Sequence, residues 1–428
     1  MIDSGLTMHG WVADLMPICR SLSGDGVRET LKYFGALQPS LEIKEVPTGT
    51  TVADWIVPKE WRIREAYVET IEGLRVIDFA ESNLHVVGYS TPVNMTMTLA
   101  ELESHLHTLP DQPSAIPYVT SYYAENWGFC LSQIQRDDLG SGPFHVVIDS
   151  ELFDGNLTYG ELVIPGFSSE EILISTYVCH PSMANNELSG PAVSIALSRW
   201  LESLESRHFT YRILLIPETI GSIIYISQNL ENLKKNVKAG WVLTCIGDNR
   251  TYSFVPSRLG NTLSDRISKK ILQDRQLDYI EYSFLDRGSD ERQWCWPGVD
   301  LPIASLMRSK YAEYPEYHTS LDDLTVVTPE GLEGGLSMMM DAIELAEGNW
   351  RWASTTLGEP QLGKRGLYPT ISTKKSAGIV KDLKNVLTFA DGNHDVIAIS
   401  DLSGVSSKVV RSVFVTLENH ALVERFEQ

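Results

Sequence analysis

The sequence predicts an α/β protein with a mixed, mostly parallel sheet covered by helices, a β-rich inserted domain and a C-terminal winged-helix domain. Three observations support this fold class. From residue 171 onward apolar strands alternate with helices, as in parallel sheets that are covered on both faces. Residues 43–160 instead show short alternating strands. Residues 379–426 show helical periodicity that ends in a strand.

Composition narrows the range of partners. The 428 residues are 43% hydrophobic and 21% charged, as in globular proteins with a sizeable core. A formal net charge of −21 argues against nucleic acid or an anionic membrane surface as the main partner. We find no long apolar run and no basic, signal-like N-terminus, so we expect no membrane span and a cytoplasmic location. The 5 cysteines lack C-x-x-C spacing, which argues against a disulfide framework and a cysteine zinc cluster.

The first elements are expected to be helices, followed by strands. Apolar residues recur at helical spacing over residues 8–22, and a second helical run spans 27–37. After these helices, strands are expected at 84–93, 144–148 and 157–163, separated by Pro-containing turns and without regular helices between them. We therefore assign residues 51–159 to an inserted β-rich domain.

The central segments predict the parallel sheet. Strands are expected at residues 172–178, 211–216 and 239–245, and helices at 193–204, 220–230 and 329–347. Residues 1–50 and 160–350 would together form this domain. In such sheets a binding site lies beyond the carboxyl ends of the strands.

The C-terminal part predicts a small separate domain. Residues 349–372 have the character of an irregular linker. Helices at 383–390, 398–403 and 406–419 and a strand at 422–426 then resemble a winged helix over 373–428. Basic and acidic residues are equal in number over 371–428, whereas DNA-binding modules carry a basic face. We expect a protein-interaction or homo-oligomerisation element, with a transcriptional regulator as the alternative.

Polar residues that follow the predicted strands suggest a metal site. His180, Glu218 and Asp248 each come after a strand, and His318 lies in a polar, aromatic-rich loop. Each has an ordinary alternative role, such as a hydrogen-bonded core histidine, a helix-terminal acid or a turn aspartate. Together they provide the imidazoles and carboxylates that a hydrolytic zinc site requires.

The order of these residues resembles that of the co-catalytic zinc aminopeptidases, whose pattern is a His, an Asp-containing loop ending in Ser-Gly, Glu-Glu, an Asp and a final His. In this comparison His180 and His318 resemble the terminal ligands and Asp248 the later Asp ligand. Glu218 stands at the general base, Asn186 at the metal-bridging Asp, Thr219 at the second Glu, and Asp290 at a Ser-Asp step.

The whole chain also resembles a bacterial family of aminopeptidase-like proteins with an inserted β domain and a C-terminal winged helix. The strings that carry this resemblance are Cys-His-Pro-Ser at 179–182, Asn-Asn-Glu-Leu-Ser-Gly at 185–190, Ile-Pro-Glu-Thr-Ile-Gly-Ser at 216–222, Gly-Ser-Asp-Glu-Arg-Gln at 288–293 and Tyr-Pro-Glu-Tyr-His-Thr-Ser at 314–320. Members of that family are often linked to polysaccharide or secondary-metabolite biosynthesis, which the resemblance implies for this chain.

Two departures from the aminopeptidase pattern alter the expected metal content. Asn186 replaces the bridging carboxylate and Thr219 replaces a ligand carboxylate. Because two neighbouring cations need anionic charge between them, we expect one zinc ion per chain. His180, His318 and one or two of Asp248, Glu187 and Asn186 are the predicted ligands.

Other residues near these loops are candidates for substrate binding: Asp290, Arg292, Arg308, Tyr311 and Tyr317. Arg308 would bind a substrate carboxylate or pair with Asp290 or Glu291. The tyrosines would stabilise an oxyanion or pack as a wall. Aromatic residues at 122–129 of the insertion would cover the crevice or belong to its core.

The predicted function is a zinc-dependent hydrolase of an amide or peptide-like bond, with Glu218 as general base and a small-molecule or peptide-like substrate. The alternative is a non-catalytic binding protein of the same fold, and metal content together with a Glu218 variant would separate the two.

Overall fold

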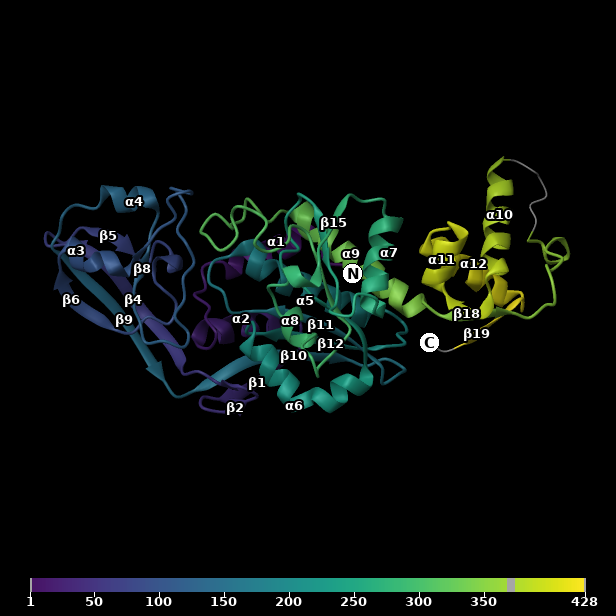
Figure 1. The fold of residues 1–428 in the computed structure, drawn as a ribbon, viewed down its shortest axis with the longest axis horizontal. Coiled ribbons are helices and arrows are strands. Elements are labelled where there is room, and N and C mark those ends of the chain that lie inside the picture. The colour runs from purple at the N-terminus through teal and green to yellow at the C-terminus, as the bar shows by residue number, and fades with distance from the viewer. Residues whose placement is uncertain (1, 368–373, 427–428) are drawn as a thin grey trace. The chain divides into compact units, whose positions relative to one another are not determined.

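The computed structural model describes residues 2–367 and 374–426 (Figure 1). The chain divides into two compact units, of which the first contains residues 1–264 and 279–337 and the second contains 265–278 and 338–428. The first unit includes the large sheet and the inserted domain. Within the described residues, no helix has the length and apolar character needed to cross a bilayer.

The large sheet has 8 strands in the order β1-β10-β12-β11-β13-β16-β14-β15. Their bounds are β1 Glu42–Pro47, β10 Asn156–Ile164, β11 Glu171–Tyr177, β12 Thr210–Ile216, β13 Val237–Val242, β14 Tyr252–Val255, β15 Tyr279–Glu281 and β16 Ile303–Met307. β11 pairs in parallel with β12 and β13, whereas β10 pairs antiparallel with β1 and β12. The predicted mixed sheet is therefore confirmed.

Helices cover this sheet because its central strands are apolar along their length. The helices of this unit are α1 Gly5–Leu15, α2 Asp25–Leu37, α5 Ser189–Ser203, α6 Ile220–Asn236 and α8 Glu291–Trp294, and α9 Pro329–Gly348 begins here. α5 links β11 to β12, and α6 leads from β12 back past β11 to β13. Because such crossovers are right-handed, these opposite directions put α5 and α6 on opposite faces of the sheet. The loops after β11 and β12 consequently meet at one edge.

The inserted domain has a sheet of 4 strands in the order β5-β4-β9-β6. Their bounds are β4 Glu60–Thr70, β5 Arg75–Asp78, β6 Val93–Met97 and β9 Phe144–Phe153, and two short pairs are β2 Thr51–Val52 with β3 Trp55–Ile56 and β7 Leu106–His107 with β8 Phe129–Cys130. Figure 1 shows β9 leading out of this domain toward β10.

Two expectations for the insertion are wrong. Residues 84–93 are not a strand, because a 3-10 turn occupies Asn83–His85 and Tyr89 has a positive φ of 68° that bends the chain. The apolar pattern of this segment reflects the packing of a buried loop rather than strand pairing. Short helices do occur, at α3 Leu99–Leu102 and α4 Gln133–Asp138, and each begins with a capping box.

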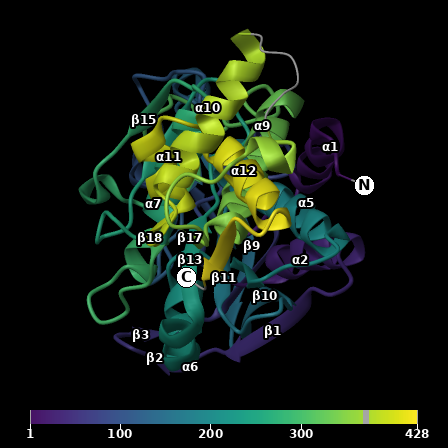
Figure 2. The ribbon, with the colours of Figure 1, turned by 90° about the vertical axis from the view of Figure 1, so that its right-hand side faces the viewer.

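The second unit contains helices α7 Leu263–Asp274, α10 Lys374–Thr388, α11 Val396–Ser403 and α12 Ser407–Asn419, with the C-terminal part of α9. Figure 2 shows α10, α11 and α12 gathered together. A 3-stranded sheet, β18-β17-β19, completes it, with bounds Asp391–Asp395, Arg351–Ser354 and Val423–Phe426. The segment at 349–372, expected to be an irregular linker, therefore begins with strand β17, which is too short for its alternation to be recognised in the sequence. Trp352 of this strand stacks on Phe414 at 5.0 Å. Residues 368–373 of that segment lie outside the described residues.

Candidate metal centre

His180 lies shortly after β11 and is held from both sides. Its Nδ1 is 2.8 Å from Glu187 Oε2, and its carbonyl oxygen accepts a hydrogen bond from Arg20 Nε at 2.8 Å. Burial, assisted by the charge of Arg20, lowers the pKa of His180 to about 3, so the ring is neutral. When Glu187 is ionised, it accepts a hydrogen bond from Nδ1–H of His180, and the lone pair then lies on Nε2. This is the usual arrangement of metal-binding histidines.

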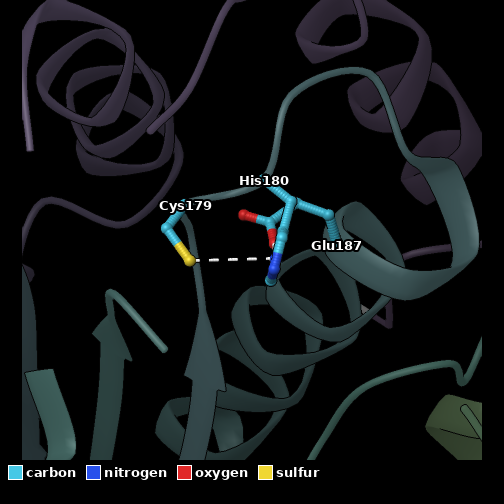
Figure 3. Close-up of side chains that lie close together, drawn as sticks. All are labelled: Cys179, His180 and Glu187. Carbon is cyan, nitrogen blue, oxygen red and sulfur yellow. Dashed lines mark hydrogen bonds and ion pairs between the residues drawn. The ribbon is translucent and has the colours of Figure 1, made fainter. Parts of the chain in front are cut away.

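Glu187 comes from a buried helical turn, Ala184–Leu188, that directly precedes α5. Burial raises the pKa of its carboxyl group to about 8, while Arg20, whose Nε lies 3.8 Å from Oε1, lowers it. Figure 3 shows Glu187 and Cys179 beside the His180 ring. Because Nδ1 of His180 is engaged with its carboxylate, Glu187 orients the imidazole and does not share a metal through that nitrogen.

Glu218 follows β12 and faces the other nitrogen of the same ring. Its Oε2 lies 3.5 Å from His180 Nε2, and its backbone N–H donates to Cys179 Sγ at 3.2 Å. Burial raises the pKa of Glu218 to about 8, nearby Asp290 raises it further, and Arg292 lowers it. A carboxyl group with a pKa near neutrality suits a residue that accepts and returns a proton.

The strained backbone of Thr219 sets the position of the preceding residue, Glu218. Its φ of 66° and ψ of −72° are those of a tight γ-turn, in which Ile220 N donates to Glu218 O at 2.8 Å. A β-branched residue rarely adopts positive φ. The turn is held because Thr219 N donates to Asp290 Oδ1 at 2.7 Å and Arg292 Nη2 donates to Thr219 Oγ1. Asp290 is thus a positioning residue for the turn that follows Glu218.

His318 brings the second imidazole to the same place. Its ring centroid is 5.4 Å from that of His180, and it stacks on Tyr317 at 3.9 Å. Burial, and then the neighbouring His180, lower the pKa of His318 to about 3. Its Nε2 is buried and has no hydrogen-bond partner among the residues that the structure describes. A neutral imidazole with a buried ring nitrogen that lacks a partner suits a metal ligand.

The inserted domain contributes one wall of this site. Tyr118 meets the His180 and His318 rings edge-on, at centroid distances of 5.3 and 5.2 Å. Its backbone N–H donates to His318 O at 2.9 Å, and Pro117 forms a β-bridge with Thr319. Sequence patterns gave no signal for Tyr118, because its segment has neither strand nor helix periodicity. The insertion is therefore part of the site.

These residues line a cavity of 350 Å³, which we call the imidazole cavity. Its polar walls are Cys179, His180, Glu218, Thr219, Arg292 and His318, and the insertion adds Trp55, Tyr118, Thr120, Tyr122 and Tyr123. The aromatic residues at 122–129 were expected either to cover the crevice or to belong to the core of the insertion. Tyr122 and Tyr123 line the cavity. Phe129 is buried in the core, and Trp127 stacks on His105 at 3.6 Å.

Asp248, predicted as a metal ligand, instead has a full set of hydrogen bonds. Its Oδ2 accepts from Asn185 Nδ2 at 3.0 Å and Ser309 N at 2.8 Å, and its Oδ1 accepts from Ser309 Oγ and Arg250 N, each at 2.9 Å. Asn186, also predicted as a ligand, accepts a hydrogen bond from Tyr177 O–H at 3.0 Å through its Oδ1. Neither side chain lines the imidazole cavity.

Arg308 and Tyr311, predicted to bind substrate, also lie outside the cavity lining. The Arg308 guanidinium covers the Tyr252 ring at 4.0 Å and donates to Thr251 O at 2.8 Å. Within the described residues it forms no ion pair, so neither Asp290 nor Glu291 is its partner. Tyr311 O–H donates to Glu291 Oε1 at 2.6 Å. Of the predicted substrate residues, Arg292 reaches the cavity and Tyr317 supports His318 by stacking.

Side chains of the types that catalytic zinc sites use line this cavity. They are the neutral imidazoles of His180 and His318, with the carboxyl group of Glu218 beside His180. Among the described residues, Cys179 Sγ, His180 and Glu187 form a group of three possible ligands whose atoms lie within 4.8 Å of one another. Burial raises the pKa of the Cys179 thiol far above its usual range, and a protonated thiol is a poor ligand.

Comparisons with known proteins agree with this fold. The model of a family described as "Domain of unknown function (DUF4910)" matches residues 9–349, and a winged helix-turn-helix model matches 350–425. A Clostridium acetobutylicum protein named "Putative polysaccharide biosynthesis protein with aminopeptidase-like domain" is 43% identical over 411 residues, covering 96% of this chain and 94% of that protein.

Solved structures show the same similarity. A crystal structure of a "putative peptidase" from Clostridium acetobutylicum is 42% identical, with a TM-score of 0.93 over 99% of this chain and 96% of that chain. The zinc aminopeptidase BSAP of Bacillus subtilis is 11% identical, with a TM-score of 0.59 over 80% of this chain and 95% of that chain. The second similarity shows a shared fold.

Proposed function

Because this chain belongs to the DUF4910 family and has an aminopeptidase-like fold, we propose that it is a zinc-dependent hydrolase of an amide or peptide-like bond. Its substrate would be a small-molecule or peptide-like compound, and the name of the Clostridium acetobutylicum relative suggests a biosynthetic intermediate. The observation that carries the proposal is the convergence of two neutral imidazoles and Glu218 on one cavity.

Each polar residue has a role in this proposal. His180 and His318 would hold the zinc ion through Nε2, and bound zinc would supply Lewis acidity to a water molecule and to the substrate carbonyl. Glu218 would take the proton of the attacking water and return it to the leaving amine. Glu187 would hold the His180 ring in place through Nδ1, and the γ-turn at Thr219 would hold Glu218.

The number of ions follows from the same residues. A second cation would require further carboxylates, yet Glu218 is the sole carboxylate among the residues found to line the cavity. Thr219 Oγ1 accepts a hydrogen bond from Arg292, and Asn186 Oδ1 accepts one from Tyr177. We therefore propose one zinc ion per chain.

The test is zinc content by elemental mass spectrometry, on full-length protein purified without chelators, together with hydrolysis of a panel of amides. We expect about one zinc per chain in the parent protein, retained in Glu218→Gln and lost in His318→Ala. His394→Ala is the matched control, because it removes a partly exposed imidazole of the second unit. Glu218→Gln should lower the rate by roughly 10²- to 10⁴-fold, the usual contribution of a general base.

A non-catalytic binding protein is the second candidate, because the cavity has so few carboxylates. Zinc in the parent protein, together with full activity in Glu218→Gln, would refute the role of that residue. A parent protein without zinc and without amide hydrolysis would favour the binding function.

A further inference from the structure

Arg292 is a cation in the wall of the imidazole cavity. Its charge opposes the rise in the pKa of Glu218 and of Asp290, without a close ion pair to either among the described residues. Its Nη2 donates to the neutral hydroxyl of Thr219, and its Nε is buried without an acceptor in the described part of the chain. No ion pair within 4.0 Å involves Arg292 among those residues. The neighbouring carboxylates have other donors. Oδ1 of Asp290 accepts from Thr219 N and Ser222 Oγ, while its Oδ2 is buried without a partner among the described residues. Glu291 accepts from Gly288 N, Ser289 N and Tyr311 O–H.

Arg292 differs from the buried Arg308, whose guanidinium also forms no ion pair among the described residues but covers the Tyr252 ring and donates to Thr251 O. The chain has 35 basic and 56 acidic residues, so acidic partners are abundant. Some part-buried arginines do pair with a carboxylate, as Arg212 does with Glu171 at 2.7 Å. The planar guanidinium binds carboxylates with parallel hydrogen bonds, and a site that keeps one unpaired can accept an anion from outside.

A second cavity, of 490 Å³, also has Arg292 and Trp55 in its lining. Its remaining walls are largely apolar, with Ile223, Ile226, Trp296 and Val299. Its one carboxylate is Asp54, exposed in the turn between β2 and β3. Arg292 therefore lies where the polar imidazole cavity adjoins an apolar space that could take an uncharged substituent.

The charges of the imidazole cavity do not suit a substrate with a free amino group. An ammonium group needs carboxylates around it, and the cavity lining supplies Glu218 alone, which the proposed reaction uses as a base. The lining does supply a fixed positive charge. An anionic substrate is complementary to that charge, and a cationic one would be repelled by it.

We propose that Arg292 binds a carboxylate of the substrate, so that the bond cleaved is the amide of an N-acyl amino acid and not one beside a free amino terminus. This inference rests on the proposed hydrolase function. Hydrolysis would break the C–N bond with one water molecule and release a carboxylic acid and the amino acid. The apolar cavity beyond Trp55 would take an apolar substituent of the substrate.

Binding of three probes to the full-length protein tests this assignment by calorimetry. N-acetyl-L-alanine carries the carboxylate, N-acetyl-L-alanine amide is its neutral match, and L-alanine amide carries the ammonium. We expect N-acetyl-L-alanine to bind at least about tenfold more tightly than the neutral amide, as a charge-assisted hydrogen bond allows. Arg292→Gln should abolish this preference, and Arg292→Lys should retain part of it.

Arg64→Gln is the control, because it removes one positive charge from an exposed site in the inserted domain. It should keep the preference for the carboxylate. Tighter binding of L-alanine amide, no binding of any probe, or an unchanged preference in Arg292→Gln would overturn the assignment. Inorganic phosphate provides a further comparison, and Arg292-dependent binding of phosphate without binding of the carboxylate would also overturn it.

Zinc content measured on the same samples separates this inference from the proposed function. Arg292-dependent binding by a protein without zinc would leave the carboxylate site standing and remove the hydrolase. Zinc together with a preference that does not depend on Arg292 would remove only the carboxylate site.

Discussion

Two polar clusters at the same edge of the large sheet differ in how fully their atoms are hydrogen-bonded. In the imidazole cavity, His318 Nε2 has no partner among the described residues, and Glu218 Oε2 lies 3.5 Å from His180 Nε2. In the other cluster, which we call the carboxylate brace, Asp248 and Asp322 receive hydrogen bonds on all four carboxylate oxygens. The brace also includes Asn185 and Ser309.

The difference shows how one sequence signal can mark two roles. Glu218 and Asp248 both follow a strand of the sheet, and they were predicted to be the general base and a metal ligand. Hydrogen bonds satisfy Asp248, so it fastens the loop after β13 to the turn before α5. Buried polar atoms left without partners are expensive in free energy and are kept where a ligand will satisfy them.

Replacement of the brace should have the largest effect. Asp248→Ala would leave the buried donors Asn185 Nδ2, Ser309 N and Ser309 Oγ without their acceptor. We expect the free energy of unfolding to fall by about 3 kcal/mol or more, measured by urea denaturation. Glu218→Gln, the comparison from the cavity, should be close to the parent protein in stability. If Asp248→Ala instead lost zinc at unchanged stability, Asp248 would be a ligand after all.

A smaller effect is expected where one residue supports the cavity indirectly. Glu187→Gln replaces the carboxyl group that contacts His180 Nδ1 with an amide. Zinc affinity should fall by roughly 10- to 100-fold, the usual effect of losing such a partner, in a competition titration with a chelator. Glu313→Gln, at a half-exposed site of the His318 loop, should bind zinc as the parent protein does. Equal affinity of the Glu187 variant would mean that the pair does not orient the ring.

The smallest effect is expected at Asp395, a partly exposed carboxylate of the second unit whose oxygens accept hydrogen bonds. Asp395 caps α11 through Ala398 N and pairs with Arg266. Although burial alone would raise its pKa, the hydrogen bonds from Arg266 and Ala398 lower it overall.

Asp395→Asn keeps the capping oxygen and loses the charge, so we expect a loss of about 0.5 to 1 kcal/mol at neutral pH. A lowered folded-state pKa gives stability above the unfolded-state pKa, so the difference between variant and parent should vanish as the pH falls below 3.8. Thermal unfolding at several pH values measures it, and a difference that persists in acid would exclude the ion pair as its cause.

Local patterns were enough to predict the sheet and two of the loops that form the site. The continuous apolar runs of β11 and β12 located the loops that carry His180 and Glu218. The distinction between brace and cavity depends on partners far away in sequence, such as Asp322, which lies 137 residues from Asn185. Periodicity contains no information on such pairs. For the same reason Tyr118 was missed, because packing against two distant imidazoles defines its role.

The bridge between the insertion and the His318 loop has a consequence for how the protein is assembled. Ile116 and Ser320 are 204 residues apart, yet Ile116 N donates to Ser320 Oγ and Ser320 N donates back to Ile116 O. During synthesis the insertion is therefore made long before the loop that it holds, and the second imidazole cannot take its place until the two meet. Excision of residues 51–159 would remove the contacts that position the loop carrying His318.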